Sequence, residues 1–174
     1  MDQIGKIFCV VGPGSFTGLR VGINFSKTLA YSIGCPMGKI NTLDLLALNA
    51  HHNDEPILST IDAQKNSIFY SIYKKVGNRF SKIESDRVIT IKQLNQIVKE
   101  RMSLCGSGLS KYWDFLDDEV KALLHGNQEF EFCNLTKIIE PNSFIQMDQM
   151  LSWNEIQPLY IKASAPEEKL NPTT

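Results

Sequence analysis

The sequence has no excess of charge of either sign and no long apolar run. Its 174 residues contain 18 basic and 19 acidic side chains, which gives a formal net charge of −1. A nearly neutral chain has no overall attraction for a polyanion, so we expect weak nucleic-acid binding at most. No apolar run approaches the roughly 20 residues that a membrane-spanning helix needs, and no signal-peptide pattern opens the chain. We therefore expect a cytoplasmic protein with no membrane segment.

Patterns typical of metal centres and disulfide frameworks are also missing. The four cysteines are scattered, without a Cys-x-x-Cys pair: Cys9, Cys35, Cys105 and Cys133. The three histidines are the neighbours His51 and His52 and the remote His125. Neighbouring side chains on a helix point about 100° apart, so they cannot share a metal as an i, i+4 pair does. We expect no metal site, and we find no set of catalytic residues in the sequence.

The apolar pattern predicts alternating strands and helices, an α/β fold. Strands are predicted over residues 6–11, 37–40, 57–63, 67–73, 79–85, 88–91 and 158–161, and helices over 16–33, 42–50, 91–102, 109–116 and 143–153. The stretch from His51 to Pro56 is polar, and we place a lobe boundary there. The prediction is a first lobe over 1–52, a second lobe over 53–164 with helix 143–153 packed on the first lobe, and a mobile tail over 165–174.

The strongest local signal is the glycine turn GPGSFTGLR at residues 12–20. A strand that enters a helix through such a turn directs backbone N–H groups and the helix dipole at one point, where a phosphate can bind. The candidate phosphate-facing residues are Gly12, Gly14 and Ser15. The spacing matches neither the P-loop nor the dinucleotide fingerprint. The residues alone favour the alternative, a tight strand-to-helix corner.

The helix over residues 16–33 has more apolar and small surface than packing on one sheet requires. Residues four apart form stripes. One stripe is small, a second is large and apolar, and only Arg20, Asn24, Thr28 and Ser32 form a polar stripe. We predict that one face packs on the chain's own sheet and another on a partner helix; the alternative is that both faces pack within the chain. The candidate partner-binding residues are Phe16, Gly18, Leu19, Gly22, Ile23, Ser26 and Ala30.

The string GPGSFTGLRVG at residues 12–22, followed by KTLA at 27–30, closely resembles the signature of the bacterial TsaB (YeaZ) family. The resemblance continues through Thr42-Leu43-Asp44, through Ile61-Asp62-Ala63 before an alternating aromatic strand, and through Pro158-Leu159-Tyr160-Ile161. It covers nearly the whole chain in order. The first motif is very specific, and the others are individually weak.

This resemblance implies a two-lobed fold of the actin/sugar-kinase/Hsp70-like, ribonuclease-H-related class. It also implies a non-catalytic subunit of the machinery that makes N6-threonylcarbamoyladenosine in tRNA, one that binds and stabilises the catalytic TsaD-type protein. Family members pair through the helix that follows the glycine turn, either with TsaD or as homodimers. The implied contacts are a TsaE-type ATPase through the complex and tRNA weakly or through partners. No cofactor is implied to bind tightly, and ATP or ADP would bind only at a partner interface.

The chain departs from the family pattern at its start. The family places a hairpin, a further strand and a helix before the glycine turn, whereas only residues 1–11 precede Gly12. We therefore expect a truncated first lobe with an exposed edge at strand 6–11.

Two alternatives remain open. One is a nucleotide-dependent or peptidase-like enzyme of the same superfold, although Ser15 is not in a Gly-x-Ser-x-Gly elbow. In that case Asp62 is a candidate cation ligand, but a turn role is favoured. The other is a self-associating remnant without TsaD contact.

Overall fold

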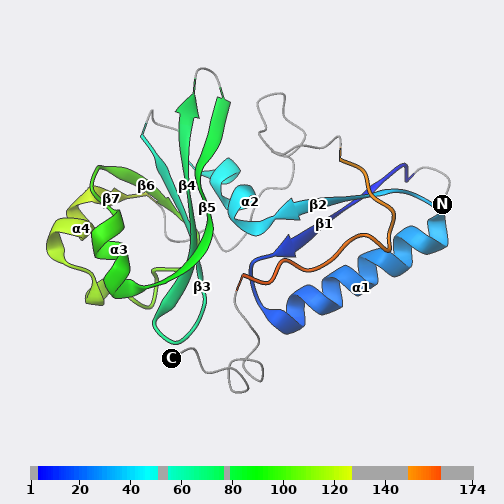
Figure 1. Ribbon diagram of the computed structural model, residues 1–174, viewed down its shortest axis with the longest axis horizontal. Helices are drawn as coiled ribbons and strands as arrows, with labels where there is room; N and C mark the ends of the chain where they lie inside the picture. Colours follow the sequence, from blue (N-terminus) through cyan, green and yellow to red (C-terminus); the bar gives the residue numbers. More distant parts are fainter. Residues whose placement is uncertain (1–3, 51–54, 77–78, 127–148, 162–174) are drawn as a thin grey trace.

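A computed structural model of the chain describes residues 4–50, 55–76, 79–126 and 149–161 and contains two sheets with a helix between them (Figure 1). In chain order the elements are β1 (Ile7–Gly12), α1 (Phe16–Ile33), β2 (Met37–Asn41), α2 (Thr42–Asn49), β3 (Ile57–Asp62), β4 (Ser67–Val76), β5 (Arg79–Thr90), α3 (Ile91–Ile97), β6 (Met102–Cys105), the 3₁₀ helix η1 (Trp113–Phe115), α4 (Asp118–Leu123) and β7 (Leu124–His125). The predicted α/β composition is confirmed. No helix in the described ranges has both the length and the apolarity needed to cross a bilayer.

The first sheet consists of β1 and β2, which run parallel and are joined by α1. The helix begins where it was predicted to begin, because the Ser15 side chain accepts a hydrogen bond from the Gly18 N–H at 3.3 Å. It ends at Gly34, whose left-handed backbone (φ 75°) lets its N–H reach the Ala30 carbonyl at 2.9 Å. Both ends thus follow from cap chemistry that the sequence displays.

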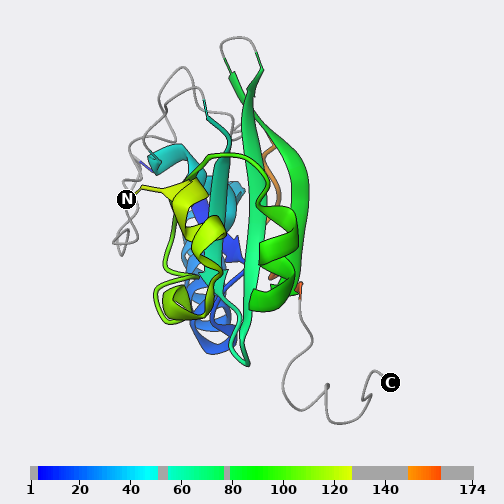
Figure 2. The same cartoon turned by 90° about the vertical axis from the view of Figure 1, so that its left-hand side faces the viewer.

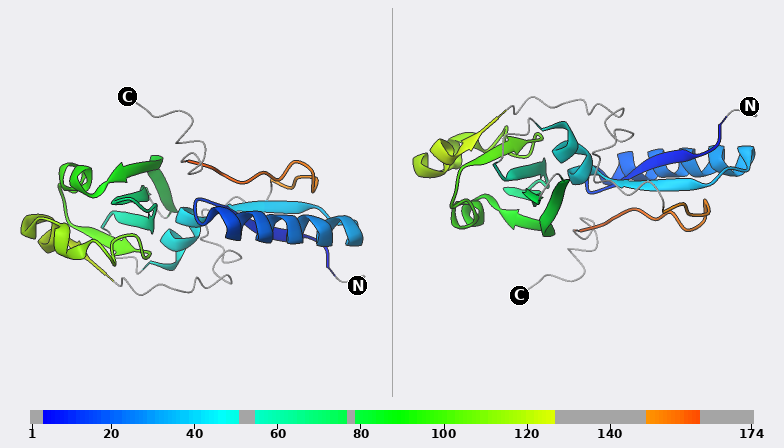
Figure 3. Two further views of the ribbon diagram at one scale, coloured as in Figure 1. Left: turned by 90° about the horizontal axis from the view of Figure 1, so that it is seen from below. Right: turned by 90° about the horizontal axis from the view of Figure 1, so that it is seen from above.

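Residues 149–161, which we call the return segment, lie along the first sheet (Figure 3). Leu151 and Met37 exchange backbone hydrogen bonds of 2.9 and 2.7 Å, and the Leu159 N–H donates to the Val11 carbonyl at 2.8 Å. Ile156 is fully buried in the core beneath α1. The return segment therefore completes the hydrophobic core of the first sheet.

The return segment corrects two predictions. Residues 149–153 are not helical, because Leu151 is extended in its bridge to Met37; residues 143–148 lie outside the described ranges, as does the predicted tail at 165–174. Residues 158–161 form no strand. Proline at 158 has no backbone N–H to donate, and the Leu159 bond to Val11 is the one backbone hydrogen bond described for this stretch.

The second sheet has five strands in the order β5-β4-β3-β6-β7. Strands β3, β4 and β5 are antiparallel, whereas β6 and β7 run parallel to β3. Helices α3 and α4 pack on one face of this sheet (Figure 2). The two strands predicted at 79–85 and 88–91 are one strand, β5, with irregular pairing opposite residues 70–73. The helix predicted to reach residue 102 ends at Ile97, and the one predicted over 109–116 consists of turns and η1.

Helix α2 packs between the two sheets. Leu45 and Leu48 contact the β1 side chains Phe8 and Val10, and the side chains at 46, 47 and 50 pack against β3, β4 and β6. A helix that is apolar on all sides is expected to be buried on all sides. The boundary predicted between residues 52 and 53 therefore falls just after an element that both sheets share, in residues outside the described ranges.

A polar network joins the start of α2 to the second sheet. Asp44 accepts a hydrogen bond from the Tyr73 hydroxyl at 2.7 Å and pairs with the Lys82 ammonium at 2.6 Å. Lys82 also pairs with Asp86 at 2.7 Å, and Asn41 donates to Asp86. Burial and the Asp44 carboxylate raise the pKa of Tyr73. Burial alone would lower the pKa of Lys82, but its two carboxylate partners raise it overall.

Candidate partner-binding site

One side of α1 presents apolar side chains that the rest of the described chain does not cover. Val21 and Phe25 are 65% and 69% exposed. Gly18 and Gly22 are exposed on the same side, and Leu29 is half-buried. These residues recur at helical spacing and form one stripe, which we call the outer face of α1: Gly18, Val21, Gly22, Phe25 and Leu29. A long apolar stripe of this kind can pack against another helix.

Gly18 and Gly22 have no side chains, so the outer face does not protrude at these two positions. Among the described residues, a Cβ on Gly22 would meet no atom within 4 Å, and one on Gly18 would make only ordinary contacts of 3.5 Å with Ser15. Neither glycine is therefore required by packing within the chain. Small residues on a helix surface let a second backbone approach closely, so this absence of side chains suits a helix–helix contact.

The structure divides the predicted partner-binding residues between two sides of α1. Gly18 and Gly22 lie on the outer face, and Ser26 is half-buried. Ile23 and Ala30 are only 2% and 1% exposed, and they pack with Cys9 and Val11 in the core of the first sheet. Assigning these two to the partner surface is therefore wrong, because β1 covers them. Leu19 also packs against this core.

Sequence reasoning missed Val21 and Phe25 as candidate contacts. The sequence did reveal an apolar stripe containing both residues, but stripe composition does not say which side of the helix faces the sheet. That choice depends on β1 and the return segment, which bury Ile23 and Ala30. The signal that the sequence offered was the position of these two large apolar residues beside Gly18 and Gly22 on the predicted helix.

Phe16, the remaining predicted contact, lies at the first turn of α1 and stacks on Tyr160. The ring centroids are 4.3 Å apart and the planes differ by 6°. The Arg20 Nε–H donates to the Tyr160 hydroxyl oxygen at 3.0 Å, and the guanidinium lies 5.3 Å from the Phe16 ring centre. These contacts hold the end of the return segment against the start of α1.

The glycine turn is partly covered by the same segment. Gly12 has φ 121°, and the Leu159 carbonyl oxygen lies 2.9 Å from where a Cβ would stand. Gly14 faces open space, while the Ser15 hydroxyl oxygen serves as the helix cap. Any anion would therefore have to approach from the Gly14–Ser15 side, and a phosphate-facing role for Gly12, Gly14 and Ser15 stays a prediction.

Asp62 is held by neighbours at the end of β3. Its carboxylate accepts hydrogen bonds from the Gln64 N–H at 2.8 Å and the Tyr112 hydroxyl at 3.1 Å, and it pairs with Lys111. Burial alone would raise the pKa of Asp62, but these donors together lower it. The bond to Gln64 confirms the favoured turn role. Within the described ranges no three Cys, His, Asp or Glu side chains gather in a metal-binding arrangement.

Comparison with known proteins agrees with the fold and the motifs. The profile of the family described as "TsaD: tRNA N6-adenosine threonylcarbamoyltransferase" matches residues 1–157. A Bacillus subtilis protein named tRNA threonylcarbamoyladenosine biosynthesis protein TsaB is 30% identical over 100 residues, which are 58% of this chain and 44% of that protein. A Haemophilus influenzae protein of the same name is 26% identical over 182 residues, covering 98% of this chain and 75% of that protein.

Solved structures resemble the whole described fold. A Pseudomonas aeruginosa protein titled as similar to peptidase YEAZ has a TM-score of 0.73 at 18% identity, covering 92% of this chain and 75% of that one. A structure titled YeaZ, also from Pseudomonas aeruginosa, has a TM-score of 0.72 at 17% identity over 91% and 74% of the two chains.

These likenesses confirm the predicted actin/sugar-kinase/Hsp70-like α/β fold. The part of the chain that matches spans less than half of the Bacillus subtilis relative. The profile, however, covers 157 of the 174 residues. Together with the common name of the curated relatives, this establishes that the chain belongs to the TsaB (YeaZ) family, within the wider TsaD-like group.

Proposed function

We propose that this chain is a cytoplasmic, non-catalytic subunit of the machinery that makes N6-threonylcarbamoyladenosine in tRNA. In this role it binds and stabilises a TsaD-type catalytic protein. The names of the relatives support the pathway. The observation that carries the proposal is the outer face of α1, which is apolar and exposed and contains two glycines. The opposite side of the same helix is buried.

The outer face has the composition of a binding surface. Burying an exposed aromatic or aliphatic side chain contributes about 1.5–3 kcal/mol, so Val21 and Phe25 together can supply a substantial part of an association energy. Aromatic residues such as phenylalanine are enriched in the buried centres of protein interfaces. Caps at Ser15 and Gly34 and the stack of Phe16 on Tyr160 fix the helix before binding. A preordered helix loses little conformational entropy when a partner docks.

The chemistry of the other candidate residues favours a partner over an enzyme. The Ser15 hydroxyl oxygen accepts the Gly18 N–H, so it serves as a helix cap. Asp62 is paired with Lys111 and Tyr112. In the proposed role tRNA and the TsaE-type ATPase bind mainly through the complex, and ATP or ADP binds only at a partner interface.

The test is to reconstitute tRNA modification with the TsaC-, TsaD- and TsaE-type proteins of the same organism. Mass spectrometry of digested tRNA should detect threonylcarbamoyladenosine when this chain is added and little when it is omitted. The matched variants are Phe25→Asp on the outer face and Asn24→Asp on the polar side of the same helix. Only Phe25→Asp should lower product formation. Equal product without the chain would overturn the proposal.

A second candidate function uses the same surface. The outer face can pair with itself, so the chain alone is expected to sediment as a homodimer, and complex formation would then exchange one copy for the TsaD-type protein. If the homodimer persists in the presence of an excess of the TsaD-type protein, the self-associating alternative would be favoured. Turnover of ATP or a peptide by the isolated chain, lost in Ser15→Ala or Asp62→Ala, would favour the enzymatic one.

A further inference from the structure

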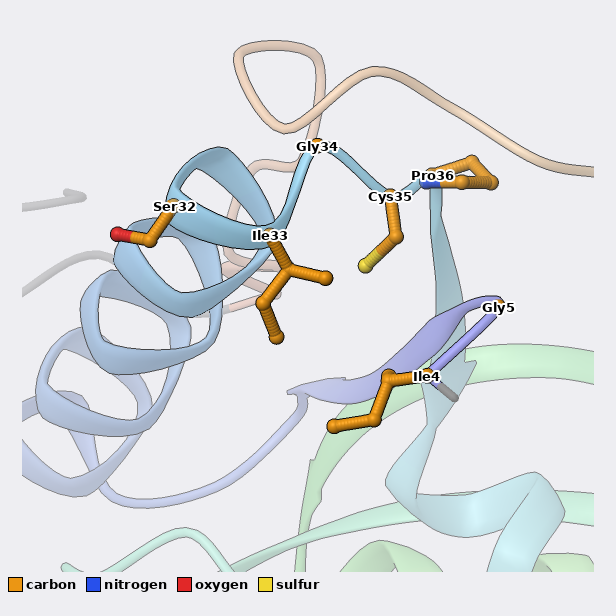
Figure 4. A pocket seen from close by; sticks show the side chains of 7 residues that line it. All are labelled: Ile4, Gly5, Ser32, Ile33, Gly34, Cys35 and Pro36. Carbon is orange, nitrogen blue, oxygen red and sulfur yellow. The ribbon is translucent and has the colours of Figure 1, made fainter. Parts of the chain in front are cut away.

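The C-terminal end of α1 carries a second surface feature, separate from the outer face. A hollow of about 520 Å³ lies where the helix end meets the return segment. Its lining includes Tyr31, Pro36, Leu151 and Trp153. A second hollow of about 400 Å³ lies on the β1 side of the same turn, where Figure 4 shows Ile4, Ile33 and Cys35 around the turn at Gly34. The first hollow is the one with a distinctive chemistry.

Two aromatic rings stand at the first hollow. Tyr31 and Trp153 meet edge to face, with ring centroids 5.3 Å apart, and are 67% and 41% exposed. In an edge-to-face pair at least one ring keeps its faces free for another group. The faces of aromatic rings are electron-rich and attract cations. The cation–ring contacts among the described residues lie elsewhere, at Lys6, Arg20 and Lys82.

The backbone at the C-terminal end of α1 also carries a partial negative charge. The helix end carries a partial negative charge, and the last turn of α1 contains no basic side chain to offset it. The Ala30 carbonyl accepts the N–H groups of Gly34 and Cys35. The carbonyls of the last three helix residues, 31 to 33, receive no hydrogen bond from the described residues beyond the helix.

A carboxylate also lies next to the hollow. Glu155 accepts the Ser152 N–H at 2.7 Å, and Ser152 lines the hollow. None of the ion pairs among the described residues includes Glu155. The two rings thus line the hollow at the helix end, and the Glu155 carboxylate lies one hydrogen bond away from it through Ser152, with no cation described at any of these groups.

We propose that this hollow, lined by Tyr31 and Trp153 at the end of α1 and flanked by Glu155 through its hydrogen bond to Ser152, is a docking site for an arginine side chain of a partner protein. Arginine fits better than lysine, because its planar guanidinium can stack on a ring while its N–H groups reach carbonyl and carboxylate oxygens in the same plane. The site is independent of the outer face, so it can exist whether or not the proposed function holds.

The probe is N-acetyl-arginine methylamide, titrated into the full chain and followed through the indole N–H signals. The chain has only two tryptophans; Trp153 stands at the hollow, and Trp113 packs against the core of the second sheet. The Trp153 signal should shift and saturate at millimolar probe while the Trp113 signal stays in place. The uncharged N-acetyl-norleucine methylamide should bind at least about fivefold more weakly.

Two variants separate charge from ring. Glu155→Gln keeps an oxygen for the Ser152 N–H, and Tyr31→Leu keeps an apolar side chain. Each should weaken arginine binding about threefold to fivefold, whereas the control variants Glu119→Gln and Phe115→Leu, at exposed positions in the second lobe, should not. Circular dichroism checks that all four variants fold. Equal binding of the norleucine probe, a Trp113 shift that follows that of Trp153, or unchanged affinity in both hollow variants would overturn the proposal.

Discussion

The two sheets of the molecule differ in how completely they cover their own apolar side chains. The five-stranded sheet has α3 and α4 on one face and α2 on the other, and it fully buries Leu58, Ile68 and Leu94. The two-stranded sheet is covered by α1, the return segment and α2, yet Val21 and Phe25 stay exposed. From this difference we predict that the large sheet contributes most of the stability, whereas the outer face of α1, beside the small sheet, is available to a partner.

Strand β1 illustrates the difference. Its sequence is apolar on both faces, as in the centre of a parallel sheet, but Ile7, Phe8 and Val10 are only half-buried. Among the described strands β1 pairs with β2 alone. Leu151 and Leu159, which come from far along the chain, add backbone hydrogen bonds at the ends of the small sheet.

The largest expected effect is a core deletion in the large sheet. Leu58→Ala should lower the free energy of unfolding by about 2–5 kcal/mol, because Leu58 is fully buried in the central strand β3. Phe25→Ala on the outer face should change it by less than about 0.5 kcal/mol. Urea unfolding of the free chain at a concentration where it is monomeric measures both values. Comparable losses of unfolding free energy in the two variants would contradict the assignment of separate stabilising and binding regions.

The junction between the regions should show in the pH dependence of stability. Because the folded pKa values of Tyr73 and Lys82 are raised, their stabilising contributions are complete below the unfolded values of about 10 and 10.4 and are lost as the pH rises above them. The free energy of unfolding should therefore fall from about pH 10 upward. In Tyr73→Phe this decline should be shallower, and unfolding curves between pH 8 and 11 measure it. The same decline in Tyr73→Phe and wild type would show that Asp44 and Tyr73 do not couple the two regions.

The smallest effects lie within α1 and have opposite signs. Ser15→Ala should cost about 1 kcal/mol, because the Gly18 N–H loses its cap. Gly22→Ala should stabilise the free chain by about 0.5–1 kcal/mol, since a Cβ there would have no atom of the described chain within 4 Å. Thermal unfolding distinguishes the two. A destabilising Gly22→Ala would mean that Gly22 is needed within the chain, and that the outer face is not built for a partner.

Much of the first sheet could be predicted because its signals are local. The bounds of α1 follow from Ser15 and Gly34, and β1 follows from an apolar run that ends in a glycine turn. The apolar sequence of helix α2 likewise agrees with its burial between the two sheets. Where a cap or a turn decides, the sequence alone was sufficient.

The return segment could not be predicted for the opposite reason. Leu151 is extended because Met37 offers a free strand edge, and those residues are more than a hundred positions apart. Its local spacing suggested a helix that tertiary pairing overrides. The inward side of α1 was missed for the same reason, since burial of Ile23 and Ala30 depends on β1 and Ile156. The hollow beside Trp153 also depends on this long-range contact.

The most direct test of the account is the dissociation constant between this chain and the TsaD-type protein of the same organism, measured by sedimentation for wild type, Phe25→Asp and Asn24→Asp. Both variants add one carboxylate to adjacent positions of α1, but only position 25 lies on the outer face. A charge buried without a partner costs several kcal/mol, so Phe25→Asp should weaken binding at least about 100-fold. Asn24→Asp should stay within about threefold of wild type. Similar constants for the two variants, or no complex with the wild type, would contradict the assignment of the outer face.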